Sequence, residues 1–289
     1  MKKLLLLLMI AMLAFITACT TEEEPPEEIV YEINTDLTDV TDLQRVEFEG
    51  REFFADGIGV VDLHRCIDGD TTHFRSQSGS VFSVRYLGID TPESTANVEP
   101  WGFAASDYVC DVLTNASEIV LEIDPNVSRV DNNGRQLAYV WYDGRLLNLE
   151  LIELAYTAAS GTGLLKYGDL MFQAQSHARM TNRRIWGEDD PIFTVDPHEV
   201  TITDLVNNPE QYYRSFVNVE AVIVDRSGTG RILSDGENTL FLFTHGSVAS
   251  ILGINHRIRF EKLFFTSHNN QYQLTNFNTR NAEFLGNEE

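Results

Sequence analysis

Apolar and polar residues alternate over short runs in residues 51–190, a pattern typical of β-strands that bury one face. The runs predicted as strands are 59–67, a strand starting at His73, 81–89, 118–123 and 136–142. Among them and after them, apolar residues recur with helical spacing, which predicts helices over 101–116, 146–155 and 170–185. Short strands with helices interleaved later predict an α+β domain, in which a small β-barrel has three helices packed on it.

A second set of short apolar runs follows in residues 200–289, after a linker predicted at residues 191–199. These runs are 217–224, 232–234, 240–244, 258–265 and 272–274. Asn269-Asn270 separates the last two runs and is typical of a hairpin turn. Five short strands favour a second, mostly β domain resembling an oligonucleotide/oligosaccharide-binding (OB) barrel, and an all-β module of another kind is the alternative.

The N-terminal residues 1–18 have the pattern of an export signal, with two lysines before a short apolar run. This run is shorter than the roughly 20 apolar residues that a spanning helix needs. Ile16-Thr17-Ala18-Cys19 resembles the lipobox of bacterial lipoproteins, in which the cysteine carries the lipid. The prediction is an extracytoplasmic protein anchored to the cell membrane through Cys19, and a secreted protein cleaved near Ala18 is the alternative.

The chain is strongly acidic, with 44 Asp and Glu residues against 21 Lys and Arg and a formal net charge of −23. Part of this excess lies in residues 19–50, which contain the run Glu22-Glu23-Glu24-Pro25-Pro26-Glu27-Glu28 and are predicted to form an acidic tether. This excess of acidic over basic residues argues against binding of nucleic acid through a broadly basic surface. A polyanion would have to be bound by a few local cations and a metal ion.

Two of the three cysteines, Cys66 and Cys110, are left after Cys19. The predicted extracytoplasmic location permits a disulfide between them, and two buried thiols are the alternative that the sequence leaves open. No Cys-x-x-Cys and no Cys/His pair at ligand spacing supports a zinc site. The glycine-containing loops 160–163 and 227–230 lack the lysine of a phosphate-binding loop, so no nucleotide cofactor is expected.

Residues 84–93 bring together the side chains that phosphate chemistry requires. Arg85 lies in a run predicted as a buried strand, and Asp90 and Glu93 follow at the point where Pro92 ends that strand. Carboxylates suit a hard metal ion, and a guanidinium suits a phosphate. Taken alone, Arg85 could form only a structural ion pair with Asp90, and Glu93 could cap the following segment.

Two further residues would complete such a site if the fold brings them to the same place. Asp70 follows the turn signal Asp68-Gly69, so Asp70 and Asp90 are predicted to lie at the ends of neighbouring strands and to share one divalent ion. Arg135 precedes the last predicted strand of the domain. Taken singly, Asp68 is typical of a turn or supporting residue, and Arg135 of a solvated turn.

Three sequence blocks, in this order, resemble the thermonuclease (staphylococcal nuclease) family. The blocks are Cys66-Ile67-Asp68-Gly69-Asp70-Thr71, then Arg85 to Glu93 with the core Ile-Asp-Thr-Pro-Glu, then Asn133-Gly134-Arg135-Gln136-Leu137-Ala138-Tyr139-Val140. Asn182-Arg183-Arg184-Ile185-Trp186 agrees as well, and the resemblance covers about residues 58–187. It implies a five-stranded OB barrel with three helices and calcium-dependent hydrolysis of DNA and RNA that leaves 3′-phosphates.

The resemblance also implies roles for individual residues. Asp70 and Asp90 match the carboxylate ligands of calcium, and Thr91 matches the residue that ligates through its backbone carbonyl. Glu93 matches the carboxylate that orients or deprotonates the attacking water. Arg85 and Arg135 match the two arginines that bind the scissile phosphate.

The chain departs from the family pattern around the nucleotide pocket. Asn132 and Asn133 stand where the type member has lysine and tyrosine, and the stretch 160–163 replaces its tyrosines, with Tyr167 further on. Base stacking is therefore expected to be weaker or differently supplied. The alternative to an enzyme is a catalytically inactive surface lipoprotein that binds nucleic acid or a protein partner through its barrels.

The last domain offers basic and aromatic residues on predicted strands: Arg257, Arg259, Lys262, Phe264 and Tyr272. Such residues could bind single-stranded nucleic acid, or they could be core aromatics with solvated charges. The sequence leaves open DNA versus RNA, internal versus end cleavage, and the oligomeric state.

Overall fold

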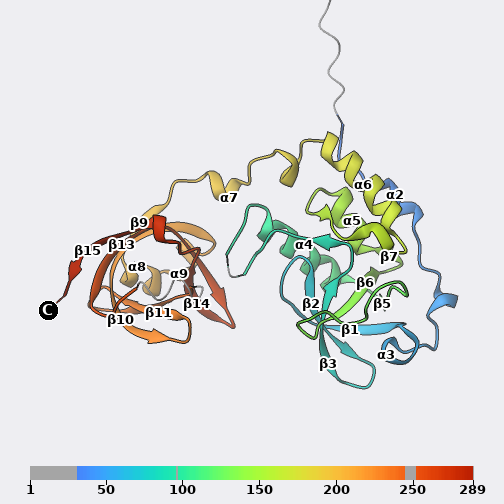
Figure 1. Ribbon diagram of the computed structural model, residues 1–289, viewed down its shortest axis with the longest axis horizontal. Helices are drawn as coiled ribbons and strands as arrows, with labels where there is room; N and C mark the ends of the chain where they lie inside the picture. Colours follow the sequence, from blue (N-terminus) through green and yellow to red (C-terminus); the bar gives the residue numbers. More distant parts are fainter. Residues whose placement is uncertain (1–30, 96, 245–251, 289) are drawn as a thin grey trace, which may run out of the picture. The chain divides into compact units, whose positions relative to one another are not determined.

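The computed structural model of the chain describes residues 31–95, 97–244 and 252–288 (Figure 1). The predicted signal peptide, the lipid-bearing Cys19 and the acidic run at residues 22–28 lie outside the described residues. Within the described part, no helix combines the length and the apolar character needed to cross a bilayer.

The first barrel is one sheet in the order β3-β2-β1-β5-β6-β7, and a parallel pairing of β3 with β6 closes five of these strands on themselves. The strands are β1 (Ile58–Cys66), β2 (Thr71–Ser76), β3 (Val81–Tyr86), β5 (Ile119–Glu122), β6 (Gln136–Tyr142) and β7 (Arg145–Leu146). Three helices accompany the barrel: α4 (Gly102–Asn115), α5 (Leu147–Glu153) and α6 (Gly168–Met180). The predicted α+β class, a five-stranded barrel with three helices, is confirmed.

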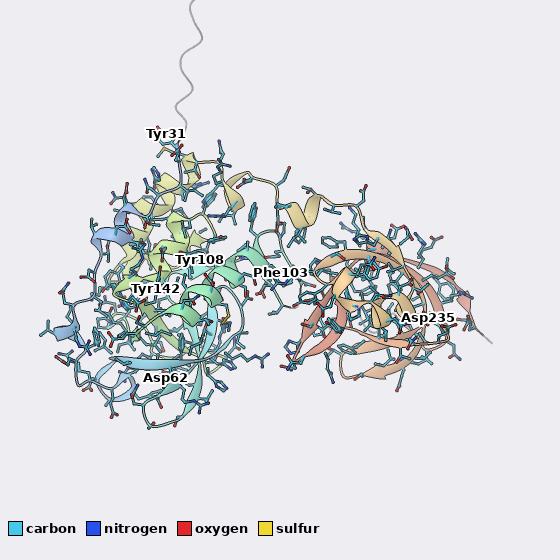
Figure 2. The ribbon with its side chains drawn as sticks, turned by 180° about the vertical axis from the view of Figure 1, so that it is seen from behind. Tyr31, Asp62, Phe103, Tyr108, Tyr142 and Asp235 are labelled. Atoms are coloured by element: carbon cyan, nitrogen blue, oxygen red, sulfur yellow. A yellow bond between two sulfur atoms is a disulfide. The ribbon has the colours of Figure 1, made fainter. Side chains whose placement is uncertain are left out.

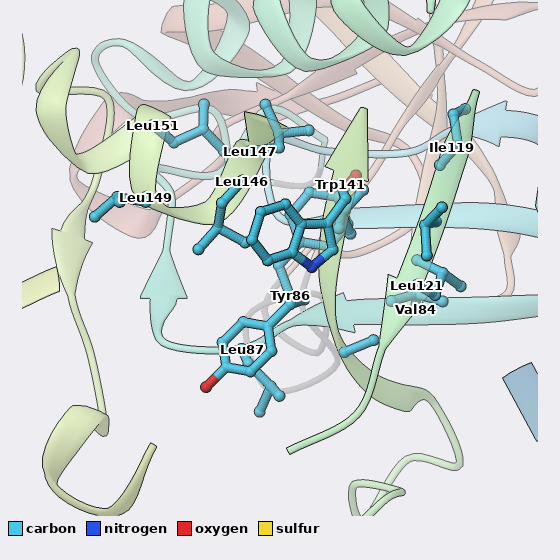
Figure 3. Close-up of a cluster of buried hydrophobic side chains, with 14 of the residues drawn as sticks. Val84, Tyr86, Leu87, Ile119, Leu121, Trp141, Leu146, Leu147, Leu149 and Leu151 are labelled. Atoms are coloured by element: carbon cyan, nitrogen blue, oxygen red, sulfur yellow. The ribbon is translucent and has the colours of Figure 1, made fainter. Parts of the chain in front are cut away.

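Large side chains fill the barrel because alternate strand positions point inward. Trp141, Tyr86 and Leu121 are almost fully buried there (Figure 3), and burial of each large apolar group contributes about 1.5–3 kcal/mol. The polar tips of the aromatic rings have partners. Trp141 Nε1 donates to the Glu122 carboxylate at 3.0 Å, and the hydroxyls of Tyr86 and Thr72 are 2.8 Å apart. The core therefore leaves these polar atoms satisfied.

The strand predicted at residues 81–89 ends earlier, at Tyr86. Gly88 has φ 77°, and a Cβ at this position would lie 2.4 Å from the sulfur of Met171, so the chain turns here at a residue without a side chain. The next two residues form β4 (Ile89–Asp90), which pairs with β8 (Ala158–Ala159) in a separate two-stranded sheet. The expectation that Asp70 and Asp90 end neighbouring strands is therefore wrong, because β4 does not pair with β2.

The helix predicted at residues 170–185 also ends early, at Met180. Asn182 and Arg184 have positive φ values of 51° and 43°, which an α-helix cannot contain. A 3₁₀ turn, η3 (Arg184–Trp186), follows instead. A second 3₁₀ turn, η2 (Thr162–Leu164), precedes α6.

A disulfide joins Cys66 at the end of β1 to Cys110 in α4, with the two Cα atoms 5.6 Å apart. The sequence left this pairing open. The bond fixes α4 to the strand end that leads into the Asp68-Gly69-Asp70 turn.

The described part of the region predicted as an acidic tether packs on the first barrel. It contains α2 (Asp36–Val40) and η1 (Arg45–Glu47), and α3 (Phe53–Asp56) follows. The carboxylate of Glu153 in α5 accepts hydrogen bonds from the backbone N–H groups of Leu37 and Thr38, at 2.8 and 2.9 Å. These are donors that the first turn of a helix leaves unpaired, so α5 caps α2.

The second barrel has the order β15-β13-β14-β12-β11-β10-β9, closed by a pairing of β13 with β10. Its strands are β9 (His198–Val200), β10 (Ser215–Ser227), β11 (Gly230–Ser234), β12 (Thr239–Leu242), β13 (His256–His268), β14 (Gln271–Thr275) and β15 (Ala282–Asn287). Its helical pieces, including one in the predicted linker, are α7 (Pro191–Thr194), α8 (Ile202–Asn207), α9 (Pro209–Tyr212) and η4 (Thr279–Asn281). The parallel pair β12–β14 corresponds to β3–β6, so both barrels have the same strand connectivity.

Candidate active site

Asp70 is held in place by its neighbours at the start of β2, where only 3% of the residue is exposed. One carboxylate oxygen, Oδ2, accepts the backbone N–H of Thr91 at 2.9 Å, and Oδ1 accepts the Thr71 hydroxyl at 3.0 Å. The preceding turn is tight, since a Cβ on Gly69 would lie 2.8 Å from Thr91 Oγ1. The turn and the Thr91 loop therefore position each other.

Arg85 connects the two aspartates that the sequence predicts as metal ligands. It lies on β3 directly opposite Thr71, and its Nη1 pairs with Asp70 while Nη2 pairs with Asp90. Nη2 also donates to the carbonyl of Ile89 at 3.3 Å. Burial opposes the charge of the guanidinium, but the two carboxylates outweigh it and raise the pKa of Arg85. Asp70 and Asp90 are thus brought together around one cation.

Arg135 reaches the same strand end from the turn before β6. Its Nε donates to the carboxylate of Asp131 at 2.7 Å, and its Nη1 lies 3.4 Å from the Thr71 hydroxyl. Thr71 therefore contacts both Asp70 and Arg135. The structure places the two predicted phosphate-binding arginines beside one residue, Thr71.

Glu93 lies on the loop after β4, and its backbone is fixed by Glu99. The Glu93 N–H donates to the Glu99 carboxylate at 3.1 Å, and the Glu93 carbonyl accepts the Glu99 N–H at 2.9 Å. Burial, together with the nearby Asp68 carboxylate, raises the pKa of Glu93 to about 7. Burial likewise raises the pKa of Asp68, although the Ser94 hydroxyl donates to it at 2.7 Å.

The donor set fits a hard divalent cation such as calcium. Asp70, Asp90 and the peptide carbonyl of Thr91 offer only oxygen ligands, the kind that calcium takes in irregular numbers and geometries. Burial is the main cause of the raised pKa values of Asp68 and Glu93, and the neighbouring carboxylates add to it. Among the described residues, no group of three His, Cys, Asp or Glu side chains converges at metal-ligand spacing. The fit thus rests on two carboxylates and a peptide oxygen.

Comparison with known proteins identifies the family of this chain. The family model "Staphylococcal nuclease homologue" matches residues 83–188. Thermonuclease of Staphylococcus intermedius is 36% identical over 128 residues, which cover 43% of this chain and 74% of that protein. The chain belongs to the staphylococcal nuclease family.

Two proteins of Bacillus subtilis (strain 168) are also similar to this chain. The SPbeta prophage-derived endonuclease YokF is 37% identical over 136 residues, or 44% of this chain and 44% of YokF. Endonuclease YncB is 36% identical over 136 residues, or 44% of this chain and 62% of YncB. The matched segments span less than half of this chain and under two thirds of these two relatives. The family model, at residues 83–188, places the relationship in the part of the chain that forms most of the first barrel.

The structure adds residues around the site that the sequence did not assign. The Asp131 carboxylate accepts hydrogen bonds from the Nε and the backbone N–H of Arg135, and the Thr71 hydroxyl contacts both Asp70 and Arg135. The position of Asp131, four residues before Arg135 in a turn, was the signal available for its role. For the contact of Thr71 with Arg135 there was none, because it joins the start of β2 to the turn before β6, 64 residues away in the sequence.

On the second barrel, the predicted set of exposed basic and aromatic residues is only partly exposed. Phe264 is fully buried, so of the two alternatives it is a core aromatic and not an exposed binding residue. Its ring stacks on Phe103 of α4, with centroids 5.4 Å apart, and Figure 2 labels Phe103. Arg257 and Arg259 form ion pairs with glutamates of the same barrel. These arginines are therefore already neutralised within their own barrel.

Proposed function

We propose that the chain is a calcium-dependent nuclease that hydrolyses DNA, RNA or both to 3′-phosphate products. The observation that supports this most directly is the convergence of Asp70 and Asp90 on Arg85, with Arg135 meeting the same strand end at Thr71. Membership of the staphylococcal nuclease family adds support, since relatives of the matched domain are named as nucleases.

The two arginines bind the scissile phosphate in this proposal. Each guanidinium offers parallel N–H donors to two phosphate oxygens, and both counter the charge that accumulates as the phosphorus is attacked. Only 20% of the Arg85 side chain is exposed, so its interaction with phosphate is less screened by water than that of a surface arginine. A phosphate that binds Arg85 would replace Asp70 or Asp90 as the partner of one guanidinium nitrogen.

Asp70, Asp90 and the Thr91 carbonyl would hold the calcium ion, which supplies charge neutralisation and alignment at the phosphate when bound. Glu93 accepts a hydrogen bond from the attacking water and orients it. The Glu99 contacts hold the Glu93 backbone, which limits the positions that the carboxylate can reach.

The site of action in this proposal is the outer cell surface. The lipobox-like sequence that ends at Cys19 supports a lipid anchor, with the following acidic residues as a spacer. The substrate would then be nucleic acid from the surroundings of the cell.

Hydrolysis of denatured DNA and of RNA by the full chain tests the activity. Acid-soluble nucleotides should be released with calcium, the release should stop with a chelator and resume when calcium is restored, and mass spectrometry should find 3′-phosphate ends. No calcium-dependent release from a protein that circular dichroism shows to be folded would reject the enzyme. The remaining hypothesis would then be a catalytically inactive lipoprotein that binds nucleic acid or a protein partner.

A further inference from the structure

A group of basic side chains lies on the outer surface of β1 and β2, on the same side of the sheet as Arg85. We call this group, His64, Arg65, His73 and Arg75, the basic face. Residues directly opposite each other in an antiparallel pair share a face, and so do residues two apart along a strand. Thr71 lies opposite Arg85, and His73 and Arg75 follow Thr71 at two-residue steps along β2.

A β-bulge adds two residues of β1 to this surface. The register of β1 against β2 shifts between Leu63 and Arg65, with Arg65 opposite His73, so His64 is the extra residue of the bulge. His64 and Arg65 are both exposed. The Arg75 Nη2 atom lies 3.1 Å from His64 Nδ1, so the group is contiguous across both strands.

These cations are not neutralised by carboxylates. Arg65 donates to the neutral side chain of Asn269 at 3.0 Å, and Arg75 donates to the carbonyl of Gly79 at 3.2 Å. In the part of the chain that the structure describes, neither arginine forms an ion pair. This holds even for Arg75, which lies opposite Asp62 of β1 (Asp62 is labelled in Figure 2). Cations left unpaired in a chain of net charge −23 are available to an anionic ligand.

The basic cluster has an electrostatic cost in the free protein. Burial lowers the pKa of His73 and repulsion from Arg65 and His64 lowers it further, which leaves Arg65 and Arg75 as the permanent cations of the group. A polyanion laid across the group would relieve this repulsion. The strand spacing of about 3.3 Å per residue puts Arg75 roughly 13 Å from Thr71, so a single ligand can reach both.

We propose that the basic face binds the phosphodiester backbone of a nucleic-acid strand that continues beyond the bond held at Arg85 and Arg135. The inference rests on the proposed function for the class of substrate, and it adds a binding surface outside the reacting centre. Contacts to backbone phosphates position a strand without reading its sequence. The basic face therefore favours long substrates over short ones.

The test compares a long and a short substrate in a double variant, Arg65→Gln/Arg75→Gln. Glutamine keeps a hydrogen-bond donor at each position and removes the charge. The matched control is Arg226→Gln/Arg280→Gln, which removes the same charge from two exposed arginines of the second barrel. The probes are a fluorescein-labelled 20-nucleotide oligothymidylate, whose binding is followed by anisotropy in the presence of a chelator, and an unlabelled dinucleotide for hydrolysis.

The double variant is expected to bind the oligonucleotide about tenfold more weakly. Its slope of log affinity against log salt should be lower in magnitude by about 1.4, for two lost phosphate contacts. The KM for the dinucleotide should stay within about twofold, and the control should behave like the unaltered chain. Unchanged oligonucleotide affinity, or equal losses with both probes, would overturn the inference.

The two proposals can fail separately in this design. Weaker oligonucleotide binding by the double variant, in a chain that hydrolyses neither probe, would support the basic face and reject the nuclease. Normal calcium-dependent hydrolysis, with the same oligonucleotide affinity in the double variant and in the unaltered chain, would support the nuclease and reject the basic face.

Discussion

At the scale of single residues, the site depends on one planar side chain. Arg85 contacts Asp70 through Nη1 and Asp90 through Nη2, so its two outer nitrogens point at two different carboxylates. A guanidinium has this fork, whereas an ammonium is a single point charge on a flexible stem. The identity of residue 85 therefore matters beyond its charge.

Arg85→Lys is expected to lower kcat/KM for denatured DNA at least about a hundredfold, because the paired donors to the reacting phosphate are lost. The melting temperature should change little, since the charge on β3 is kept. Initial rates with calcium and a thermal unfolding curve measure both quantities.

Arg259→Lys is the control for this substitution. Arg259 binds both oxygens of Glu199, at 2.8 and 2.9 Å, but it lies on β13 of the second barrel, which contains none of the proposed site residues. The kcat/KM of the Arg259→Lys variant should equal that of the unaltered chain. Equal rates for the two variants would mean that Arg85 does not bind the reacting phosphate.

At the scale of elements, the site is assembled from segments that are fixed to one another. The Asp68-Gly69-Asp70 turn follows β1, and the Cys66–Cys110 disulfide joins the end of β1 to α4. The Glu93 loop is held at its backbone by Glu99, which lies just before α4. Both segments that bear carboxylates are therefore tied to the same helix region.

The Cys66→Ala/Cys110→Ala double variant is expected to lower the free energy of unfolding by about 2–4 kcal/mol, since a cross-link spanning a sequence separation of 44 residues restricts the unfolded chain. Urea denaturation measures the change, and reduction of the unaltered chain should reproduce it. Activity of the folded variant should persist, because Asp70 keeps its hydrogen bonds from Thr91 and Thr71. The same urea midpoint for the oxidised chain and the variant would show that the bond does not form.

At the scale of the whole molecule, the chain combines a large negative charge with small basic regions. A net charge of −23 disfavours non-specific adsorption to nucleic acid, so in the proposed function binding would be concentrated at Arg85, Arg135 and the basic face. A protein with such local binding gains from being kept where substrate arrives. The proposed anchor at Cys19 would do this.

Cys19→Ser is expected to move the protein from the membrane fraction into the culture medium, with its specific activity unchanged, because one residue would have carried the lipid. Fractionation of cells expressing each form, followed by immunoblotting and a nuclease assay, measures this. A variant that stays with the membrane would contradict the proposed anchor, and Cys66→Ala/Cys110→Ala serves as a control for loss of cysteine elsewhere.

The sequence by itself determined the elements that a local residue pattern and flanking turn signals indicate. It predicted β6 at its observed bounds, residues 136–142, and located α4 within a residue. The family followed from three short blocks, because turns such as Asp68-Gly69-Asp70 depend on local backbone chemistry. The six proposed site residues were chosen in the same way, and their catalytic roles stay predictions.

The tertiary structure decided whatever depended on residues far apart in the chain. The break at Gly88 reflects the approach of Met171, and the capping of α2 requires Glu153. The pairing of Cys66 with Cys110 and the alignment of Arg75 with Arg85 on one face are likewise set by packing and register. Local sequence patterns report the propensity of a segment and its buried side. They do not contain the free energy of contacts between segments, which selects one arrangement only when the whole chain folds.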